Sequence, residues 1–183
     1  MSYINNIKNY IPICDQEKKD KDVILKCLNT FEDILTRKNI VAHLTSSGFI
    51  INKEKTKTLM IHHNIYRSWG WTGGHMDGDN DFLNVAIKEA KEETGLKNVK
   101  PLFDKISSLD VIPVKSHYKK GEFISSHLHL SIAYILVADE KESIHIKEDE
   151  NSNIKWININ EVMEYTKNEP HMQLIYKKLI NSI

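Results

Sequence analysis

The sequence is poor in arginine. Of the 25 basic residues in this chain of 183, only Arg37 and Arg67 are arginine, and the other 23 are lysine. Because only a guanidinium group can grip two phosphate oxygens in a planar fork, the chain can make that contact at two positions at most. The 25 basic residues are balanced by 25 acidic ones, so no net charge draws the protein to nucleic acid or to an anionic membrane. We therefore expect no nucleic acid and no membrane among its partners.

Long apolar runs and cysteine clusters are also missing. Apolar runs such as residues 132–138 fall far short of the roughly 18 residues that a membrane helix needs. Residues 1–22 are polar and rich in Asn and Lys, without a signal-peptide pattern. Cys14 and Cys27 stand alone, without the CxxC spacing of a zinc site. These absences predict a soluble, cytoplasmic protein.

The first 80 residues predict a helix, a hairpin and a loop. Apolar residues at helical spacing predict an amphipathic helix over residues 20–37. We expect its apolar stripe to dock on the main domain or on a partner subunit, which leaves a homodimer open. Two β-rich runs, 41–51 and 58–62, predict a hairpin. The irregular segment 64–80 holds four of the seven glycines and two of the three tryptophans, which is typical of backbone that approaches a ligand closely.

The rest of the chain predicts one domain of mixed structure. A helix is expected over residues 81–94, with Asp81 at its N-cap and Gly95 ending it. Further elements are β-rich runs near residue 102 and over 106–114, 123–137 and 154–159, then helices over 160–166 and 170–183. The 40% of apolar residues suffice for a single core. We divide the chain into a helical extension, 1–40, and one domain, 41–183.

Three carboxylates gather on the helix of residues 81–94. Glu89, Glu92 and Glu93 fall within an arc about 100° wide, beside the side predicted to be buried. Their repulsion costs a few tenths of a kcal/mol per pair on an isolated helix, so a cation should offset it. Clustered oxygen ligands suit Mg²⁺ or Mn²⁺. The alternative is a solvated charged face stabilised by Lys88 and Lys91.

The context of these glutamates favours the metal. The stretch from Gly73 to Leu96 resembles the Nudix box: Gly, five residues, Glu, seven residues, Arg-Glu-aliphatic, one residue, Glu-Glu, one residue, Gly-aliphatic. With Gly74 in the first position, the matching residues are Glu89, Glu92, Glu93, Gly95 and Leu96. The departures are Asn80 for Glu, Lys88 for Arg and Ala90 for a larger aliphatic residue.

Resemblance to the Nudix hydrolase family implies a fold and an activity. The implied fold is α+β, a Nudix-like α/β/α sandwich with a mixed β-sheet, to which this chain adds an N-terminal amphipathic helix. The implied enzyme is a pyrophosphohydrolase that splits a phosphoanhydride bond of a nucleoside diphosphate linked to another group, using metal-activated water. The implied cofactor is Mg²⁺ or Mn²⁺, and the partner is a small nucleotide. The implied metal ligands are the Gly74 carbonyl, Glu89, Glu92 and Glu93.

The general base is left open by the resemblance. Some relatives use a box glutamate, here Glu92 or Glu93, and others use a glutamate in a loop before a late Trp-containing strand. Here that loop precedes Trp156, and Glu150 is our first choice as base or extra metal ligand, with Glu148 second. A solvated acidic loop is the alternative.

Three further residues are candidates to bind substrate. Arg67 lies seven residues before Gly74, and we hypothesise that it contacts a substrate phosphate; the alternative is a surface arginine. His127 and His129 point to the same face of a β-run and could stack on or hydrogen-bond to a nucleotide. A structural role on the sheet face is the alternative, and a zinc site lacks supporting Cys or HxxxH spacing.

Substrate identity stays open. Val111 stands where the family carries a Pro as its marker for ADP-ribose, and Pro113 stands where it carries a Tyr as its marker for dinucleoside polyphosphates, so neither marker fits cleanly. We slightly favour ADP-ribose or a nucleotide sugar as the substrate, and a noncanonical nucleoside triphosphate is a comparable alternative. One rival is a nucleotide sensor that has lost turnover through Asn80. Another is an enzyme like isopentenyl diphosphate isomerase, which we rank low because Cys14 and Cys27 lie far upstream of the motif.

Overall fold

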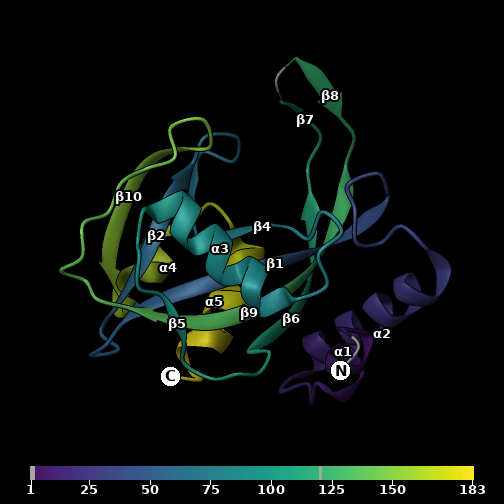
Figure 1. Ribbon diagram of the computed structural model, residues 1–183, viewed down its shortest axis with the longest axis horizontal. Helices are drawn as coiled ribbons and strands as arrows, with labels where there is room; N and C mark the ends of the chain where they lie inside the picture. Colours follow the sequence, from purple (N-terminus) through teal and green to yellow (C-terminus); the bar gives the residue numbers. More distant parts are fainter. Residues whose placement is uncertain (1–2, 120) are drawn as a thin grey trace.

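The computed structural model describes residues 3–119 and 121–183 (Figure 1). Its helices are α1 (Tyr3–Asn9), α2 (Asp15–Thr30), α3 (Phe82–Thr94), the 3-10 turn η1 (Ile159–Glu161), α4 (Val162–Tyr165) and α5 (Pro170–Ile180). Its strands are β1 (Ala42–Asn52), β2 (Lys57–His63), β3 (Ser68–Gly70), β4 (Thr72–His75), β5 (Lys100–Pro101), β6 (Ser108–Val114), β7 (His117–Lys119), β8 (Glu122–Ile124), β9 (His127–Ala138) and β10 (Asn151–Asn158).

One mixed sheet forms the centre of the protein. Its main path runs β10-β2-β1-β9-β5, with β3 on β2, β4 on β1 and β6 on β9. The central strands β1 and β9 run parallel, from the pair Ala42 and Leu128 to the pair Asn52 and Ala138. All residues of β1 are buried, as expected for a strand that is covered on both faces.

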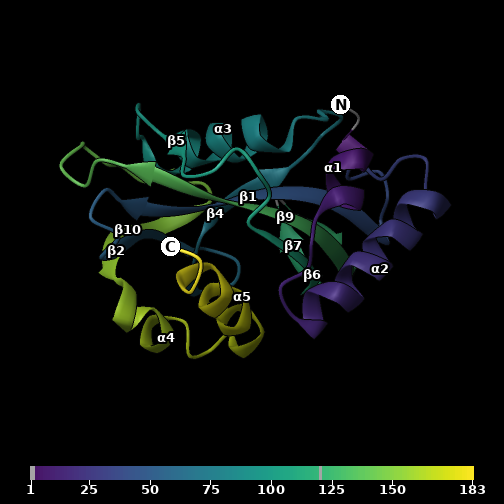
Figure 2. The same ribbon diagram turned by 90° about the horizontal axis from the view of Figure 1, so that it is seen from below.

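Helices cover both faces of the sheet, as Figure 2 shows: α3 lies on one face and α4 and α5 lie on the other. Leu44 and Ile50 of β1 belong to the core that contains Phe82 of α3. The alternate residue Phe49 belongs to the core under α5 and stacks on Tyr176 with ring centroids 6.0 Å apart. This arrangement confirms the predicted α/β/α sandwich with a mixed sheet.

The N-terminal helix forms, but at shifted bounds. The predicted helix over 20–37 is observed as α2, Asp15–Thr30, preceded by the short α1. It begins earlier because acidic residues suit a first helical turn and because Glu17 accepts a hydrogen bond from the Ile13 amide (2.9 Å). It ends earlier because the backbone of Phe31 is extended. Ile24 of α2 is fully buried in the main core, so the helix docks on the rest of the chain as predicted.

A buried polar network fastens α2 to the domain. Lys178 of α5 lies 3.0 Å from the Glu17 carboxylate and 2.6 Å from that of Asp110 in β6. Both carboxylates are buried, and Ser108 donates to the same pair. Helix α2 therefore contacts the domain through polar as well as apolar groups. The division into residues 1–40 and 41–183 stays a prediction.

Two β-strand predictions were wrong in detail. The segment 64–80 is not irregular throughout, because it contains β3 and β4, and the run 123–137 divides into β8 and β9. Glycine-rich β4 could not be read as a strand because glycine is depleted in strands. It pairs with β1 so closely that a Cβ at Gly73 would lie 2.6 Å from Ser47 Oγ. No helix in the described part of the chain is long and apolar enough to cross a membrane.

Candidate active site

Helix α3 positions the three box glutamates. Its N-terminus is capped by the Asp81 side chain, which accepts a hydrogen bond from the Asn84 amide (3.0 Å). Its C-terminus is closed by Gly95, whose φ of 74° suits glycine. Both caps are as predicted. Phe82, Val85, Ala86 and Ala90 pack on the sheet, which holds the helix beside β4.

Glu93 lies within the buried face of α3 and not merely beside it. Its side chain accepts a hydrogen bond from the Gly73 amide (3.0 Å), and the residue is 3% exposed. Burial raises the pKa of its carboxyl to about 8; the Gly73 amide opposes that rise and the charges of Glu89 and Glu150 add to it. To be ionised at neutral pH, a carboxyl group buried this deeply needs a cation beside it.

Glu89 packs directly on Gly74, the first residue of the box. A Cβ at Gly74 would lie 2.3 Å from Glu89 Cδ, so any side chain there would displace the carboxylate. Burial raises the pKa of Glu89, and the neighbouring Glu92 adds to the rise. Glu92 itself is exposed, with a carboxylate oxygen 3.9 Å from Lys88 Nζ. This set of oxygen donors next to a backbone carbonyl fits a hard divalent cation.

The acidic loop before β10 comes close to the helix. The charge of Glu150 raises the pKa of both Glu89 and Glu93, and that of Lys147 lowers both. Lys147 lies 3.2 Å from Glu150. Burial is the largest single influence on Lys147 and disfavours its charge, but the hydrogen bond to Glu150 and the charges of the neighbouring carboxylates together raise its pKa. Sequence reasoning missed Lys147, whose only signal is a lysine inside an acidic loop. Glu148 is exposed.

The carboxylates that surround Asn80 have other partners. Arg37 binds Asp77 in a two-pronged contact of 2.9 and 2.6 Å. Asp79 accepts from the Asp81 amide (2.9 Å), and Asp81 caps the helix. The exposed Asn80 therefore has no idle carboxylate next to it in the sequence to act in place of the family's glutamate.

Arg67 lies in the loop between β2 and β3. Its side chain is exposed and forms no hydrogen bond or ion pair within residues 3–119 and 121–183, and its φ of 50° is in the left-handed region. The same loop touches the acidic loop, because the Asn64 amide donates to the Glu150 carbonyl (2.9 Å). Arg67 is thus an unengaged cation on a loop tied to Glu150, and its phosphate contact stays a prediction.

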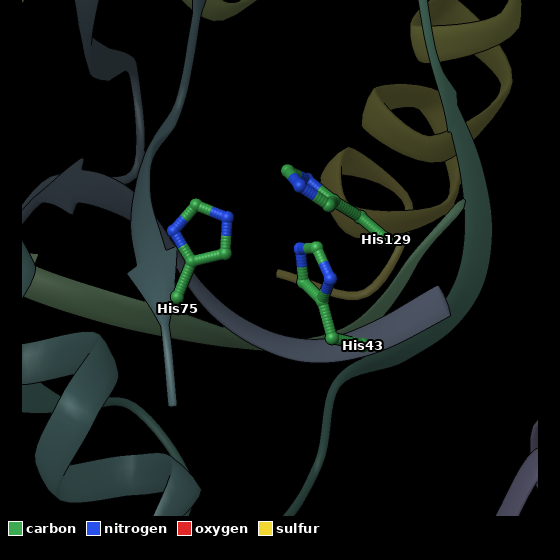
Figure 3. A group of neighbouring side chains, drawn as sticks. All are labelled: His43, His75 and His129. Carbon is green, nitrogen blue, oxygen red and sulfur yellow. The ribbon is translucent and has the colours of Figure 1, made fainter. Parts of the chain in front are cut away.

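His127 and His129 lie together with His75, which the sequence offers as a possible zinc partner without supporting spacing, and with His43, which the sequence does not connect to them. Strand β1 contributes His43 and β4 contributes His75, and Figure 3 shows the rings of His43, His75 and His129 turned toward one another. Burial lowers the pKa of His75 to about 3 and that of His129 to about 2, with neighbouring histidines adding to both shifts. His75 alternates with Gly74 along β4, so the cluster lies on the sheet face away from Glu89. Nucleotide contact by His127 and His129 stays a prediction.

Comparison with known proteins identifies the class of protein. A family model described as the NUDIX domain matches residues 42–179. The chain therefore belongs to the Nudix family, and it is a Nudix-type pyrophosphohydrolase, a hydrolase that acts on acid anhydrides. Members of this family generally use divalent metal cations.

Three individual proteins that resemble this chain share 26% or less of their sequence with it. The chain is 26% identical over 140 residues to a probable DHNTP pyrophosphohydrolase of Lactococcus lactis subsp. cremoris, covering 76% of this chain and 80% of the relative. Its fold is similar to a C. elegans Ap4A hydrolase (TM-score 0.55, 17% identity, 74% of this chain and 93% of the other). It is also similar to the E. coli dihydroneopterin triphosphate pyrophosphohydrolase (TM-score 0.53, 16% identity, 75% and 95%).

Proposed function

We propose that this protein hydrolyses the pyrophosphate linkage of a small phosphorylated metabolite with Mg²⁺ or Mn²⁺. The cation is held by Glu89, Glu92, Glu93 and the carbonyl of Gly74, and Glu150 is a further ligand or the general base. The observation that carries the proposal is the packing of two carboxylates against two adjacent glycines: Glu93 bonds the Gly73 amide, and Glu89 fills the space that a side chain at Gly74 would take.

The chemistry requires positioning and charge neutralisation. When bound, the cation neutralises pyrophosphate charge and lowers the pKa of a coordinated water. The protein fixes the ligand geometry, because the Gly73 amide orients Glu93 and the glycine backbone sets the position of Glu89. Glu150 accepts the proton of the attacking water, and Lys147 holds Glu150 in place from 3.2 Å away. Arg67 grips an oxygen pair of the substrate phosphate.

For the substrate we propose a triphosphate first, with dihydroneopterin triphosphate as the lead compound. Support comes from the named activities of two relatives, one curated and one of known structure. ADP-ribose, nucleotide sugars, dinucleoside polyphosphates and noncanonical nucleoside triphosphates complete the panel. The protein is incubated with each compound in Mg²⁺ or Mn²⁺, and the products are separated to locate the broken bond.

Variants separate hydrolysis from its rivals. Glu93→Gln and Glu89→Gln should each lower kcat by about 100-fold or more, as expected on losing a metal ligand or base. Glu164→Gln, at an exposed carboxylate in a surface ion pair, is the matched control and should change nothing. Turnover that survives Glu92→Gln together with Glu93→Gln would refute the site. Tight binding of one compound without turnover would support the sensor.

The role of Arg67 has its own test. Arg67→Lys retains the charge and loses the planar fork, so KM should rise if the side chain grips phosphate. The same kcat and KM as the unmodified enzyme would contradict the contact.

A further inference from the structure

Four histidines from three strands share one face of the sheet. In the parallel pair β1 and β9, His43 lies opposite His129, and His127 lies two residues before it on the same face. His75 of β4 lies opposite Thr45, which is two residues beyond His43 and also on that face. Ring centroids are 4.9 Å apart for His43 and His75, 5.1 Å for His43 and His129, and 5.0 Å for His75 and His129.

His43 carries a ring nitrogen without a partner. Its Nδ1 lies 2.9 Å from the Asn39 carbonyl oxygen, which can only accept, so Nδ1 donates and Nε2 holds a lone pair. This Nε2 is buried and bonds to nothing within residues 3–119 and 121–183. An unsatisfied buried nitrogen is costly. A ring that donates from one nitrogen to a backbone carbonyl and leaves the other free matches the arrangement typical of a metal-bound histidine.

His127 has the same arrangement. Its Nδ1 donates to the Ser125 carbonyl oxygen (2.8 Å), which leaves a lone pair on Nε2. That Nε2 lies 3.3 Å from Nε2 of His129. Two imidazoles bound tetrahedrally to zinc at about 2.0–2.1 Å have their nitrogens about 3.4 Å apart. The spacing of this pair, which without metal suits a hydrogen bond from His129 to His127, equals that of two zinc ligands.

We propose that His43, His75 and His129, with His127 as the fourth ligand, bind a divalent transition metal ion such as Zn²⁺. Ligand atoms of the first three lie within 4.8 Å of one another. Their rings face a common centre in Figure 3, so side-chain rotations would bring all three onto one ion. Imidazole nitrogens suit Zn²⁺, Cu²⁺ or Ni²⁺, whereas Mg²⁺ prefers oxygen. The site differs in chemistry from the glutamate site and lies on the other face of β4.

The charges around the cluster leave room for a cation. Arg37 lies near His43 and His75, but Asp77 neutralises it through the two-pronged contact. Lys119 is the other cation whose charge reaches His75. A bound ion would join β1, β4 and β9 and so fix the strand that carries Gly73 and Gly74. The proposal does not depend on the substrate or on the hydrolytic activity.

The test uses the full chain freed of metal with a chelator. Titration with Zn²⁺ alone, followed by calorimetry and by competition with a coloured chelator, should give one site that His43→Gln or His129→Gln weakens at least tenfold. Losing even an outer-shell partner typically weakens metal binding 10–100-fold. His171→Gln, at a half-exposed histidine beside Glu169, is the matched control and should bind Zn²⁺ normally.

Two further measurements keep the proposal refutable if a variant is unstable. In the unmodified protein, nitrogen NMR signals of His43, His75 and His129 should shift on adding Zn²⁺, and those of His171 should not. Glu89→Gln with Glu93→Gln should retain the Zn²⁺ site. Equal Zn²⁺ affinity in the histidine variants and the parent, loss only in the glutamate variant, or response of the cluster to inorganic phosphate and not to Zn²⁺ would each overturn the proposal.

Discussion

Replacing Lys178 with methionine should destabilise the protein strongly. The lysine lies between two carboxylates whose side chains are 0% and 1% exposed, those of Glu17 and Asp110. Without it, the two buried carboxylates keep only uncharged donors among the described residues: the Ile13 amide and the side chains of Tyr10, Gln16 and Ser108. Removing one member of a buried ion pair costs about 3–5 kcal/mol. For a chain of this size that lowers Tm by about 6–20 °C.

The loss should also depend on pH. Burial already raises the pKa of Asp110, and Lys178 opposes the rise, so in the variant the folded-state pKa moves further up. A carboxyl whose folded-state pKa exceeds its unfolded value of about 4 stabilises the fold below that pH and loses this contribution as pH rises through the folded-state pKa. The difference in unfolding free energy between Lys178→Met and the parent should therefore be larger at pH 8 than at pH 5.

The assay is denaturant unfolding followed by circular dichroism at both pH values. Lys177→Met is the matched control, because Lys177 is exposed and forms no ion pair among the residues that the structure describes. It should change stability by less than about 0.5 kcal/mol. Equal losses for the two variants, or a Lys178→Met loss that does not change with pH, would refute the reasoning.

Three other substitutions, one of them with a comparison variant, test the packing around the site. Gly74→Ala should nearly abolish hydrolysis with little loss of fold, measured as kcat beside circular dichroism, because the new methyl displaces Glu89. Gly95→Ala should lower the unfolding free energy by more than about 1 kcal/mol, because the φ of Gly95 is 74° and the new methyl would meet the His145 ring. Gly78→Ala is the comparison: Gly78 also has a positive φ, but the space around it is open, so the loss in the same denaturation assay should be smaller. Phe82→Ala should lower the unfolding free energy by about 3–5 kcal/mol in that assay, because the Phe82 ring is buried between α3 and the sheet.

Local patterns predicted the elements whose signals are local. The helix of the box formed within one residue of its expected bounds because Asp81 and Gly95 are strong caps. The hairpin of β1 and β2 likewise follows from two β-rich runs and a polar turn. Strand β4 was missed because its identity comes from pairing with β1, which no local propensity records.

The candidate site was predictable where a motif spans a short stretch. Box spacing led to Glu89, Glu92 and Glu93, whereas the burial of Glu93 depends on the contact of α3 with Gly73 in β4. Sequence spacing argued against a zinc site at His127 and His129, because His43 and His129 meet only through the parallel pairing of β1 with β9. Spacing rules for zinc ligands assume neighbours in sequence, and these ligands are neighbours only in space.

The parallel pairing of β1 with β9 also sets the order of events during synthesis. Paired residues such as Ser46 and Ile132 are 86 positions apart. At about 5–20 residues per second, a ribosome needs roughly 4–17 s to make the second partner after the first. Throughout that interval β1 has only β2 and β4 as possible strand neighbours, and its other edge is open. The nascent chain thus exposes a row of unpaired backbone N–H and C=O groups along β1 for seconds, and such an edge can pair with another chain.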